Sequence, residues 1–283
     1  MLLVSSASII IRYTEAPPLA IAFYRVFFAS LLIFIFQSKK TVEEIRSYSK
    51  NTIFITAAAG FFLALHFAAF IISLSYTTVA NSVILVDSAP LFALLLSYLI
   101  LKESAKLTSI LAVIVALTGA AVISWGDIST DPALFKGDLY AIAGAAALAV
   151  YLVFGRIIRP KVSLTPYLVL VYGFAALFLG SICILNRVAF FGYSGIVYML
   201  FLMLAILPTV GGHSMFLYTL KYLKAYVVNL GFLGEPVGAA ILAYVFFREV
   251  PHWYFYFGGI MIFAGLVFVI INEEKNKEVL KEI

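Results

Sequence analysis

The sequence predicts an all-α membrane protein of about ten transmembrane helices, arranged as two inverted five-helix repeats. Its composition is the first observation behind this prediction. Of the 283 residues 64% are hydrophobic and only 12% are charged, with a mean hydropathy of +1.09. Soluble domains carry about 25% charged residues. This composition therefore excludes a water-soluble globule and indicates a chain with many membrane spans.

The second observation is an internal repeat with a constant offset of 146 residues. The matched landmarks are Tyr76 with Tyr222, Pro90 with Pro236, Tyr98 with Tyr244, Lys102-Glu103 with Arg248-Glu249, and Gly119 with Gly265. A self-match at a fixed period predicts the architecture of the whole chain. Because each half holds five helices, an odd number, the second half enters the membrane in the opposite sense. Inverted repeats of this kind usually place a substrate site near the bilayer midplane.

A helix needs about 20 residues to cross the hydrocarbon of a bilayer. Ten apolar segments qualify as spans, and nine of them are long enough to cross completely. The first segment is short, and at 1.5 Å per residue it crosses about two thirds of the bilayer, so we expect a native start upstream of Met1. Pro17 and Pro18 suit the first turn of the second helix. The predicted helices are 1–13, 17–36, 52–74, 78–101, 107–125, 137–157, 165–185, 195–220, 226–247 and 253–271.

The stretch from Gly126 to Lys136 contains the turn-forming pair Asp131-Pro132 and is predicted to separate the halves. The predicted domains are a first repeat over 1–126, a second repeat over 137–272 and a charged cytosolic tail over 273–283.

The distribution of Lys and Arg predicts the orientation. Fourteen of the 19 lie in the loops and tail of one side, four lie on the other side, and Arg25 lies within a span. Cytoplasmic loops carry the excess of positive charge, so we expect both termini in the cytoplasm of a multi-pass protein of the plasma membrane. The net charge of +5 then reflects topology and not a nucleic-acid partner. We predict no signal peptide, and the single Cys183 allows no disulfide within the chain.

Five ionisable side chains fall inside predicted spans. They are Arg25, His66, Asp87, His213 and Glu235. A charge at the centre of the bilayer costs at least about 2.5–3.5 kcal/mol on insertion scales, so such residues usually face a cavity or a partner. We predict that they bind substrate or protons. The competing interpretation is structural: a hydrogen-bonded carboxyl or histidine that fixes helix packing, and an Arg25 that extends toward the outer interface.

Other polar and helix-breaking residues could shape the same cavity. Further polar edges are supplied by Tyr24, Tyr151, Tyr172, Tyr218 and Asn229. Candidate helix breaks or hinges are Pro90, Pro208, Pro236, Gly234 and Gly238, and for the two glycines we favour close helix packing over a hinge. Glu103 and Glu249, at the ends of matched spans, are expected to cap helices or to pair at the interface.

The chain lacks the signatures of an enzyme. It contains no HExxH, GxSxG or Walker A motif, and three histidines with one cysteine offer no metal-ligand cluster. We therefore expect no catalytic residues, cofactor or metal. The expected partners are a small-molecule substrate, protons and the lipid bilayer, and no oligomeric state is predicted.

Three sequence elements resemble those of the drug/metabolite transporter superfamily, EamA branch. They are Pro17-Pro18 before Ala22-Phe23-Tyr24-Arg25, Ala89-Pro90 followed by Lys102-Glu103, and Glu235-Pro236 followed by Arg248-Glu249. The resemblance covers nearly the whole chain, and the short first helix departs from it. It implies a secondary carrier in the cell membrane, often an exporter of amino acids or other small metabolites, with a central cavity that opens alternately to each side.

Carried onto this chain, the resemblance implies that predicted helices 1–4 and 6–9 line the cavity and that helices 5 and 10 are peripheral. We expect the two halves to rock around a midplane site that contains Glu235 and Asp87, with either proton coupling or uniport. Two other classes of function stay open on sequence grounds: an intramembrane enzyme that handles lipids, and a membrane receptor that transports nothing.

Overall fold

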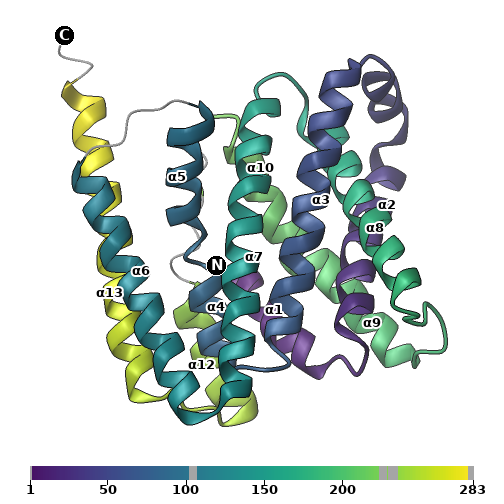
Figure 1. Ribbon diagram of the computed structural model, residues 1–283. Helices are drawn as coiled ribbons and strands as arrows, with labels where there is room; N and C mark the ends of the chain where they lie inside the picture. Colours follow the sequence, from purple (N-terminus) through teal and green to yellow (C-terminus); the bar gives the residue numbers. More distant parts are fainter. Residues whose placement is uncertain (1, 102–106, 223–227, 229–234, 280–283) are drawn as a thin grey trace.

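The structure, a computed structural model, describes residues 2–101, 107–222, 228 and 235–279. These residues form a bundle of helices that run roughly parallel to one another (Figure 1). Six helical segments are long and apolar enough to cross a membrane, and four shorter apolar helices accompany them. The chain is therefore an all-helical, multi-pass membrane protein.

In chain order, the helices of the bundle are α1 (Leu2–Tyr13), α2 (Pro18–Arg46), α3 (Lys50–Ser73), α4 (Val79–Val86), α5 (Ala89–Leu101), α6 (Leu107–Thr130), α7 (Pro132–Ile158), α8 (Leu164–Leu185), α9 (Gly195–Leu204), the π-helix η1 (Ala205–His213), α10 (Ser214–Thr219), α12 (Glu235–Phe247) and α13 (Trp253–Val279). The predicted residues Asn229 and Gly234, and also Lys102 and Glu103, lie outside the described ranges.

The predicted helix 78–101 is two helices, α4 and α5, with Asp87 and Ser88 between them. Pro90 explains the break, because it has no N–H to donate to the carbonyl of Val86, four residues earlier. The chain adapts with a tighter turn in which the N–H of Ser88 bonds to Leu85 O at 3.2 Å. The interruption places the Asp87 carboxyl at the end of a half-helix.

The predicted helix 195–220 is likewise divided, into α9, η1 and α10. Pro208 lies inside the π-helix η1 and has no N–H, so it cannot make the bond to Leu204 O that a regular α-helix would contain. π-Helical turns are rare and occur frequently at functional sites.

The predicted bounds at 125 and 137 are wrong, because α6 continues to Thr130 and α7 begins at Pro132. Asp131 acts as the N-cap of α7, and its Oδ1 accepts a hydrogen bond from the Ala133 N–H at 2.8 Å. Pro at the next position suits the first turn of a helix. The pair Asp131-Pro132 thus starts a helix and does not form a loop. Similarly, α2 runs ten residues past the predicted end at Phe36.

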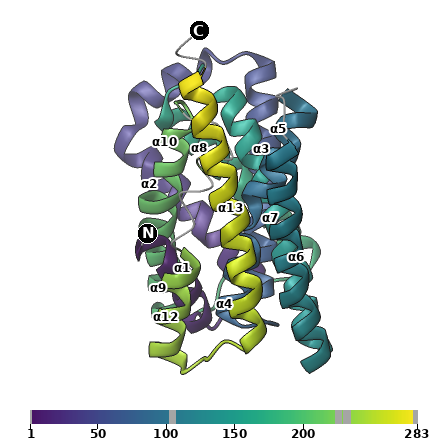
Figure 2. The same ribbon diagram turned by 90° about the vertical axis from the view of Figure 1, so that its left-hand side faces the viewer.

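The two halves of the chain are interleaved. Helix α3 of the first half packs against α7 and α8 of the second, α2 packs on α8, and α1 packs on α12. Figures 1 and 2 both show α6 and α13 side by side at one edge of the bundle, and they pack closely along their length. A Cβ on Gly119 would lie 2.5 Å from Gly258 O, so glycine is required at this crossing.

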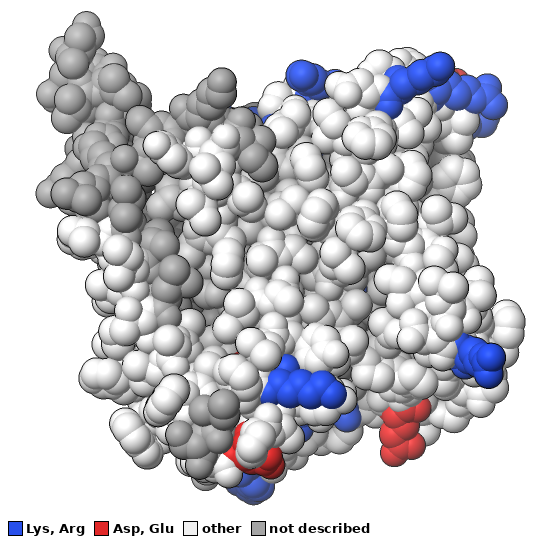
Figure 3. Space-filling view, in the orientation of Figure 1, with Lys and Arg blue, Asp and Glu red and all other residues white. Residues whose placement is uncertain are grey.

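Charged side chains are concentrated at the two ends of the face shown in Figure 3, with a largely uncharged band between them. Large apolar side chains such as Phe54, Leu177 and Ile260 are exposed on the bundle surface. A surface of this kind is stable only against hydrocarbon.

Candidate functional site

A small closed cavity lies between the two halves, and all five ionisable residues predicted within spans line it. Its walls are Val4, Ala7, Arg25, His66, Phe67, Phe70, Val83, Val86, Asp87, Leu148, His213 and Glu235. The volume is about 20 Å³, close to the space that one water needs. The charged side chains come from both halves and from five different elements, so only the folded bundle brings them together.

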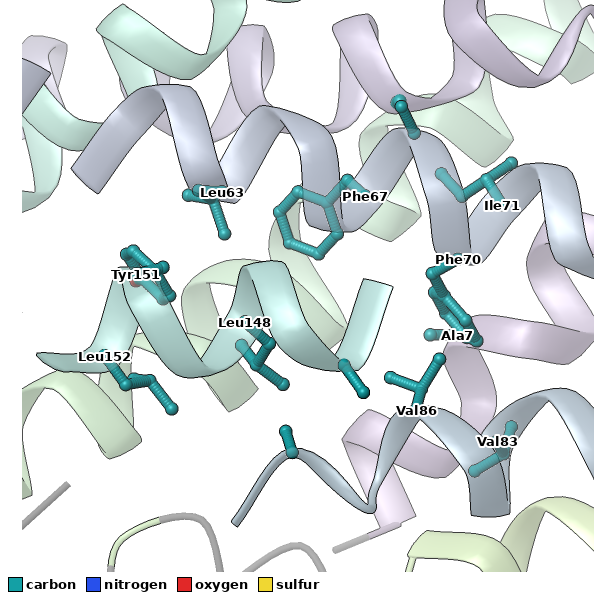
Figure 4. Packing of buried hydrophobic residues seen from close by; sticks show 14 of the residues in the cluster. Ala7, Leu63, Phe67, Phe70, Ile71, Val83, Val86, Leu148, Tyr151 and Leu152 are labelled. Carbon is teal, nitrogen blue, oxygen red and sulfur yellow. The ribbon is translucent and has the colours of Figure 1, made fainter. Parts of the chain in front are cut away.

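Figure 4 labels several of the apolar residues that line this cavity: Phe67 and Phe70 of α3, Leu148 of α7, Val83 and Val86 of α4, and Ala7 of α1. The described residues of α6, α8 and α13 contribute no wall. Helices α6 and α13 correspond to predicted helices 5 and 10, for which the resemblance implied a peripheral position, and their absence from the wall agrees with it. Helix α8 corresponds to predicted helix 7, which was expected to line the cavity, so here the structure differs from the expectation.

Arg25 is fully enclosed, with 1% of its surface exposed. Its Nε–H donates to Thr209 Oγ1 at 2.7 Å, and its guanidinium carbon lies 4.0 Å from the centre of the Phe67 ring. A cation held over an aromatic face is attracted by the ring quadrupole. Within the described part of the chain, Nη1 of Arg25 has no hydrogen-bond partner.

The two histidines of the cavity lie beside each other, with ring centres 6.1 Å apart. His66 Nδ1 is 3.0 Å from Gly144 O. A carbonyl only accepts, so Nδ1 carries the proton in this pair and Nε2 is left for other contacts. His213 packs edge-on against Phe67, at 5.2 Å between ring centres.

Asp87 and Glu235 are both 6% exposed, and both line the cavity together with Arg25. The structure shows no ion pair between Arg25 and either carboxylate among the described residues. Asp87 Oδ2 is buried without a hydrogen-bond partner in the described chain.

Two predicted site residues lie elsewhere. Tyr24 stacks on Phe201 of α9 at 4.6 Å, and its hydroxyl donates to Phe190 O, so it joins an aromatic cluster between α2 and α9. Tyr151 is fully buried next to Leu152 (Figure 4), and its hydroxyl has no partner in the described part of the chain. Neither lines the cavity. Asn229 lies outside the described residues.

The three predicted helix-breaking prolines lie close in sequence to residues of the cavity wall. Pro90 and Pro208 interrupt their helices beside Asp87 and His213, and Pro236 follows Glu235 directly. Gly238 is a packing position, because a Cβ there would lie 2.5 Å from Ser5 Oγ on α1.

Sequence reasoning missed Thr209. It is fully buried and forms the hydrogen bond to Arg25 described above. A threonine in an apolar segment does not stand out as a charge does, and its position directly after Pro208 was the available signal.

The ends of the bundle carry two carboxylates that connect the halves. Glu249 Oε1 pairs with Arg12 Nη1 at 3.1 Å, and its Oε2 accepts from the Val79 N–H at 3.0 Å. This agrees with the capping or pairing role expected for Glu249. At the other end, Glu44 Oε1 accepts from the Ser163 N–H at 2.8 Å.

A groove of about 850 Å³ between α12 and α13 is much larger than the central cavity. Its walls are almost entirely apolar side chains such as Ile241, Phe255 and Phe263, and Glu249 is its one carboxylate within the described ranges. It lacks converging polar groups, so the charged cavity is the better candidate site.

Comparison with known proteins supports a transporter. The model of the "EamA-like transporter family" matches residues 1–125 and 135–271. The chain is 23% identical over 287 residues to the "Uncharacterized transporter YxxF" of Bacillus subtilis, an alignment that covers 100% of this chain and 90% of that protein. It is 26% identical over 265 residues to an "Uncharacterized transporter" of Archaeoglobus fulgidus, covering 94% and 91%.

A solved structure titled "Crystal structure of protein" has the same fold, with a TM-score of 0.69 at 18% identity, and the match covers 97% of this chain and 94% of that one. The family matches extend over most of both halves of the sequence. The chain belongs to the EamA-like transporter family and is a membrane transporter.

Proposed function

We propose that this protein is a secondary-active or facilitative carrier of the plasma membrane that exports small metabolites, amino acids and related compounds, by alternating access around the charged cavity. The observation that carries this proposal is the convergence of Arg25, His66, Asp87, His213 and Glu235, from both halves, on one closed space. In the proposed topology both termini are cytoplasmic and the halves are inverted repeats.

The cost of burying charge supports a functional role for the site. Each charge in the membrane interior costs at least about 2.5–3.5 kcal/mol, and a core of similar volume could be built from apolar residues at no such cost. The cavity contains two carboxyl groups and one guanidinium. A proton or a substrate ammonium group is the natural partner of the second carboxyl group.

The size of the cavity supports movement of the halves. A space of about 20 Å³ has no room for a metabolite, so a solute enters only when the halves separate on one side. The proposed outer closure is the Arg12–Glu249 pair, and the proposed inner closure is the Glu44 contact with Ser163.

Counterflow in proteoliposomes tests this function. The purified chain is reconstituted, loaded with each unlabelled compound of an amino-acid and metabolite panel, and supplied with the same compound carrying a radiolabel. We expect accumulation of at least one compound by the wild type, and at least tenfold slower exchange by Asp87→Asn. The exposed Glu15→Gln is the matched control.

The result also separates the alternative classes. Chemical turnover of reconstituted lipid without exchange of any compound would replace the carrier with a lipid-handling enzyme. Saturable binding of a panel compound without exchange would favour a receptor.

A further inference from the structure

We infer that Thr209 is the positioning residue that holds Arg25 toward the cavity, and that Nη1 of Arg25, which has no partner among the described residues, binds a carboxylate group of the transported solute. The identity of the ligand as a transported solute rests on the proposed function. The positioning itself follows from the contacts around η1.

The contacts begin at Pro208, which has no N–H and so cannot supply the α-helical donor to the carbonyl of Leu204, four residues earlier. In the π-helical register of η1, which pairs residues five apart, Thr209 is the residue that faces this carbonyl. The hydroxyl of Thr209 donates to it, with Oγ1 at 2.7 Å from Leu204 O. A carbonyl accepts and never donates, so the single hydroxyl proton of Thr209 points at Leu204.

The hydrogen bond from Thr209 to Leu204 determines how Thr209 contacts Arg25. Because the hydroxyl proton of Thr209 is donated to Leu204 O, Thr209 Oγ1 can only accept hydrogen bonds from other groups. The Nε–H of Arg25 donates to it at 2.7 Å, a short distance for a charge-assisted hydrogen bond. The π-helical register that Pro208 imposes thus both aims the hydroxyl and fixes the guanidinium.

The guanidinium of Arg25 has further N–H donors besides Nε–H. Phe67 covers one face of the guanidinium, and Thr209 occupies Nε, yet Nη1 is buried without a partner in the described chain. A buried donor on a charged group is destabilising when it lacks an acceptor. Its placement in a cavity wall indicates that a ligand supplies the missing acceptor in another state of the cycle.

The shape and charge of the guanidinium indicate which group of a ligand it binds. The guanidinium is a planar fork whose geometry matches a carboxylate. Asp87 and Glu235 line the same cavity, but the contacts with Thr209 and Phe67 hold Arg25 without an ion pair to either one. A solute carboxylate can therefore reach Nη1 without first displacing an internal ion pair.

The positioning is tested with protein labelled with ¹⁵N-arginine in detergent, by NMR of the Arg25 Nε–H and its rate of exchange with solvent. Wild type and Thr209→Ser, which keeps the hydroxyl, should protect this proton. In Thr209→Val, which is isosteric but has no hydroxyl, the Arg25 Nε–H should exchange with solvent at least tenfold faster. Thr118→Val is the matched control, because Thr118 donates to its own helix at Ile114 O on α6, away from the cavity. Equal protection in Thr209→Val would overturn the positioning role.

The ligand is tested in the same micelles by thermal stabilisation with paired probes, namely acetate and the α-amino acids against their methyl esters. The wild type should bind at least one carboxylate and bind its ester about tenfold more weakly. Thr209→Val should lose about tenfold in affinity for the carboxylate, Thr209→Ser should stay within about threefold, and Arg25→Lys should lose the discrimination.

Esters that bind as well as acids, or a panel that leaves both the melting temperature and the Arg25 signal unchanged, would overturn the carboxylate assignment. These measurements need no flux. A protein that binds carboxylates at Arg25 and exchanges none of them would therefore contradict the transporter proposal alone.

Discussion

Arg25 is the residue on which the charge balance of the cavity depends. Among the described residues of the cavity wall it is the one guanidinium beside two carboxyl groups, and the described chain holds it by a hydrogen bond from Nε and by the face of Phe67. Removing it takes the guanidinium away from two buried carboxyl groups.

We therefore predict that Arg25→Gln lowers stability by about 2–4 kcal/mol, because an uncompensated buried charge is strongly destabilising. Glu235→Gln alone should cost less. The double variant should recover part of the loss, since it removes one charge of each sign. Thermal unfolding of the four proteins in detergent measures this coupling, and strictly additive losses would show that Arg25 and Glu235 do not interact.

Glu44, at the cytoplasmic end of α2 in our topology, gives a prediction about pH. Partial burial by itself raises the pKa of Glu44, but hydrogen bonds from the Ser163 N–H and from the Tyr48 hydroxyl outweigh this and lower the pKa below its ordinary value. A carboxyl group with a lowered folded-state pKa stabilises the fold above its unfolded pKa, and this stabilisation is lost as pH falls through the folded pKa.

Glu44→Gln should accordingly lower the melting temperature at pH 7, by an amount that corresponds to at most about 1 kcal/mol because solvent screens the site. The difference between the two proteins should disappear as the pH is lowered through the acid titration of Glu44. A difference that is the same at every pH would mean that the charge of Glu44 plays no part.

Much of the site is predictable at the residue scale, because an ionisable side chain in an apolar run stands out. Arg25, His66, Asp87, His213 and Glu235 all stand out for that reason, and the structure brings them to one cavity. The sequence does not show that Tyr24 and Tyr151 lie outside the cavity, because the side of a helix that faces the cavity depends on packing partners distant in sequence. Thr209 carries no charge and has moderate polarity, so nothing but its neighbour Pro208 marks it.

At the scale of single elements, the interrupted helices α4–α5 and α9–η1–α10 are the parts that differ most from the prediction. The prolines are visible in the sequence, but a proline in a membrane helix gives a kink, a break or a π-turn according to what satisfies the freed carbonyl. At Pro208 that acceptor is satisfied by the next residue, Thr209. Side-chain contacts therefore decide whether a proline kinks or breaks the helix, and the hydrophobic pattern of the sequence does not reveal these contacts.

We predict that Pro208→Ala stabilises the protein and impairs its activity. The restored N–H can donate to Leu204 O, which favours a regular helix over the π-helix and releases the hydroxyl of Thr209. Thermal unfolding should show an equal or higher melting temperature, while exchange falls about tenfold. Pro160→Ala, between α7 and α8, is the control. Unchanged exchange in Pro208→Ala would show that the π-helical register is not needed.

At the scale of the whole molecule, the repeat and the family resemblance indicate two related halves, and the structure shows that they interlock. The sequence does not predict how α1 packs on α12 or α3 on α7, because those contacts join distant segments. The Arg12–Glu249 pair at one end and the Glu44–Ser163 contact at the other also depend on this interlocking.

The Arg12–Glu249 pair gives a prediction about access to the cavity. In a background of Cys183→Ala, Ala7→Cys places a thiol in the cavity wall. Glu249→Gln should raise its labelling by an impermeant thiol reagent added outside by several-fold, because the outer ends of α1 and α12 separate more easily. Glu15→Gln, near Arg12 but exposed, should change nothing. Slower labelling in Glu249→Gln would contradict an outer closure.

Uptake into proteoliposomes, with and without an imposed pH gradient, shows whether the charged cavity between the halves carries the solute. The compound is one that exchanges in counterflow, and the proteins are wild type, Glu235→Gln and the exposed control Glu15→Gln. We predict that wild type and control take up the compound and that Glu235→Gln does so at least several-fold more slowly. An acceleration by the gradient that is present in the wild type and absent from Glu235→Gln would indicate proton coupling, and a wild type that does not respond to the gradient would indicate uniport. Uptake by Glu235→Gln at the wild-type rate, with the wild-type response to the gradient, would show that the charged cavity is not the transport site.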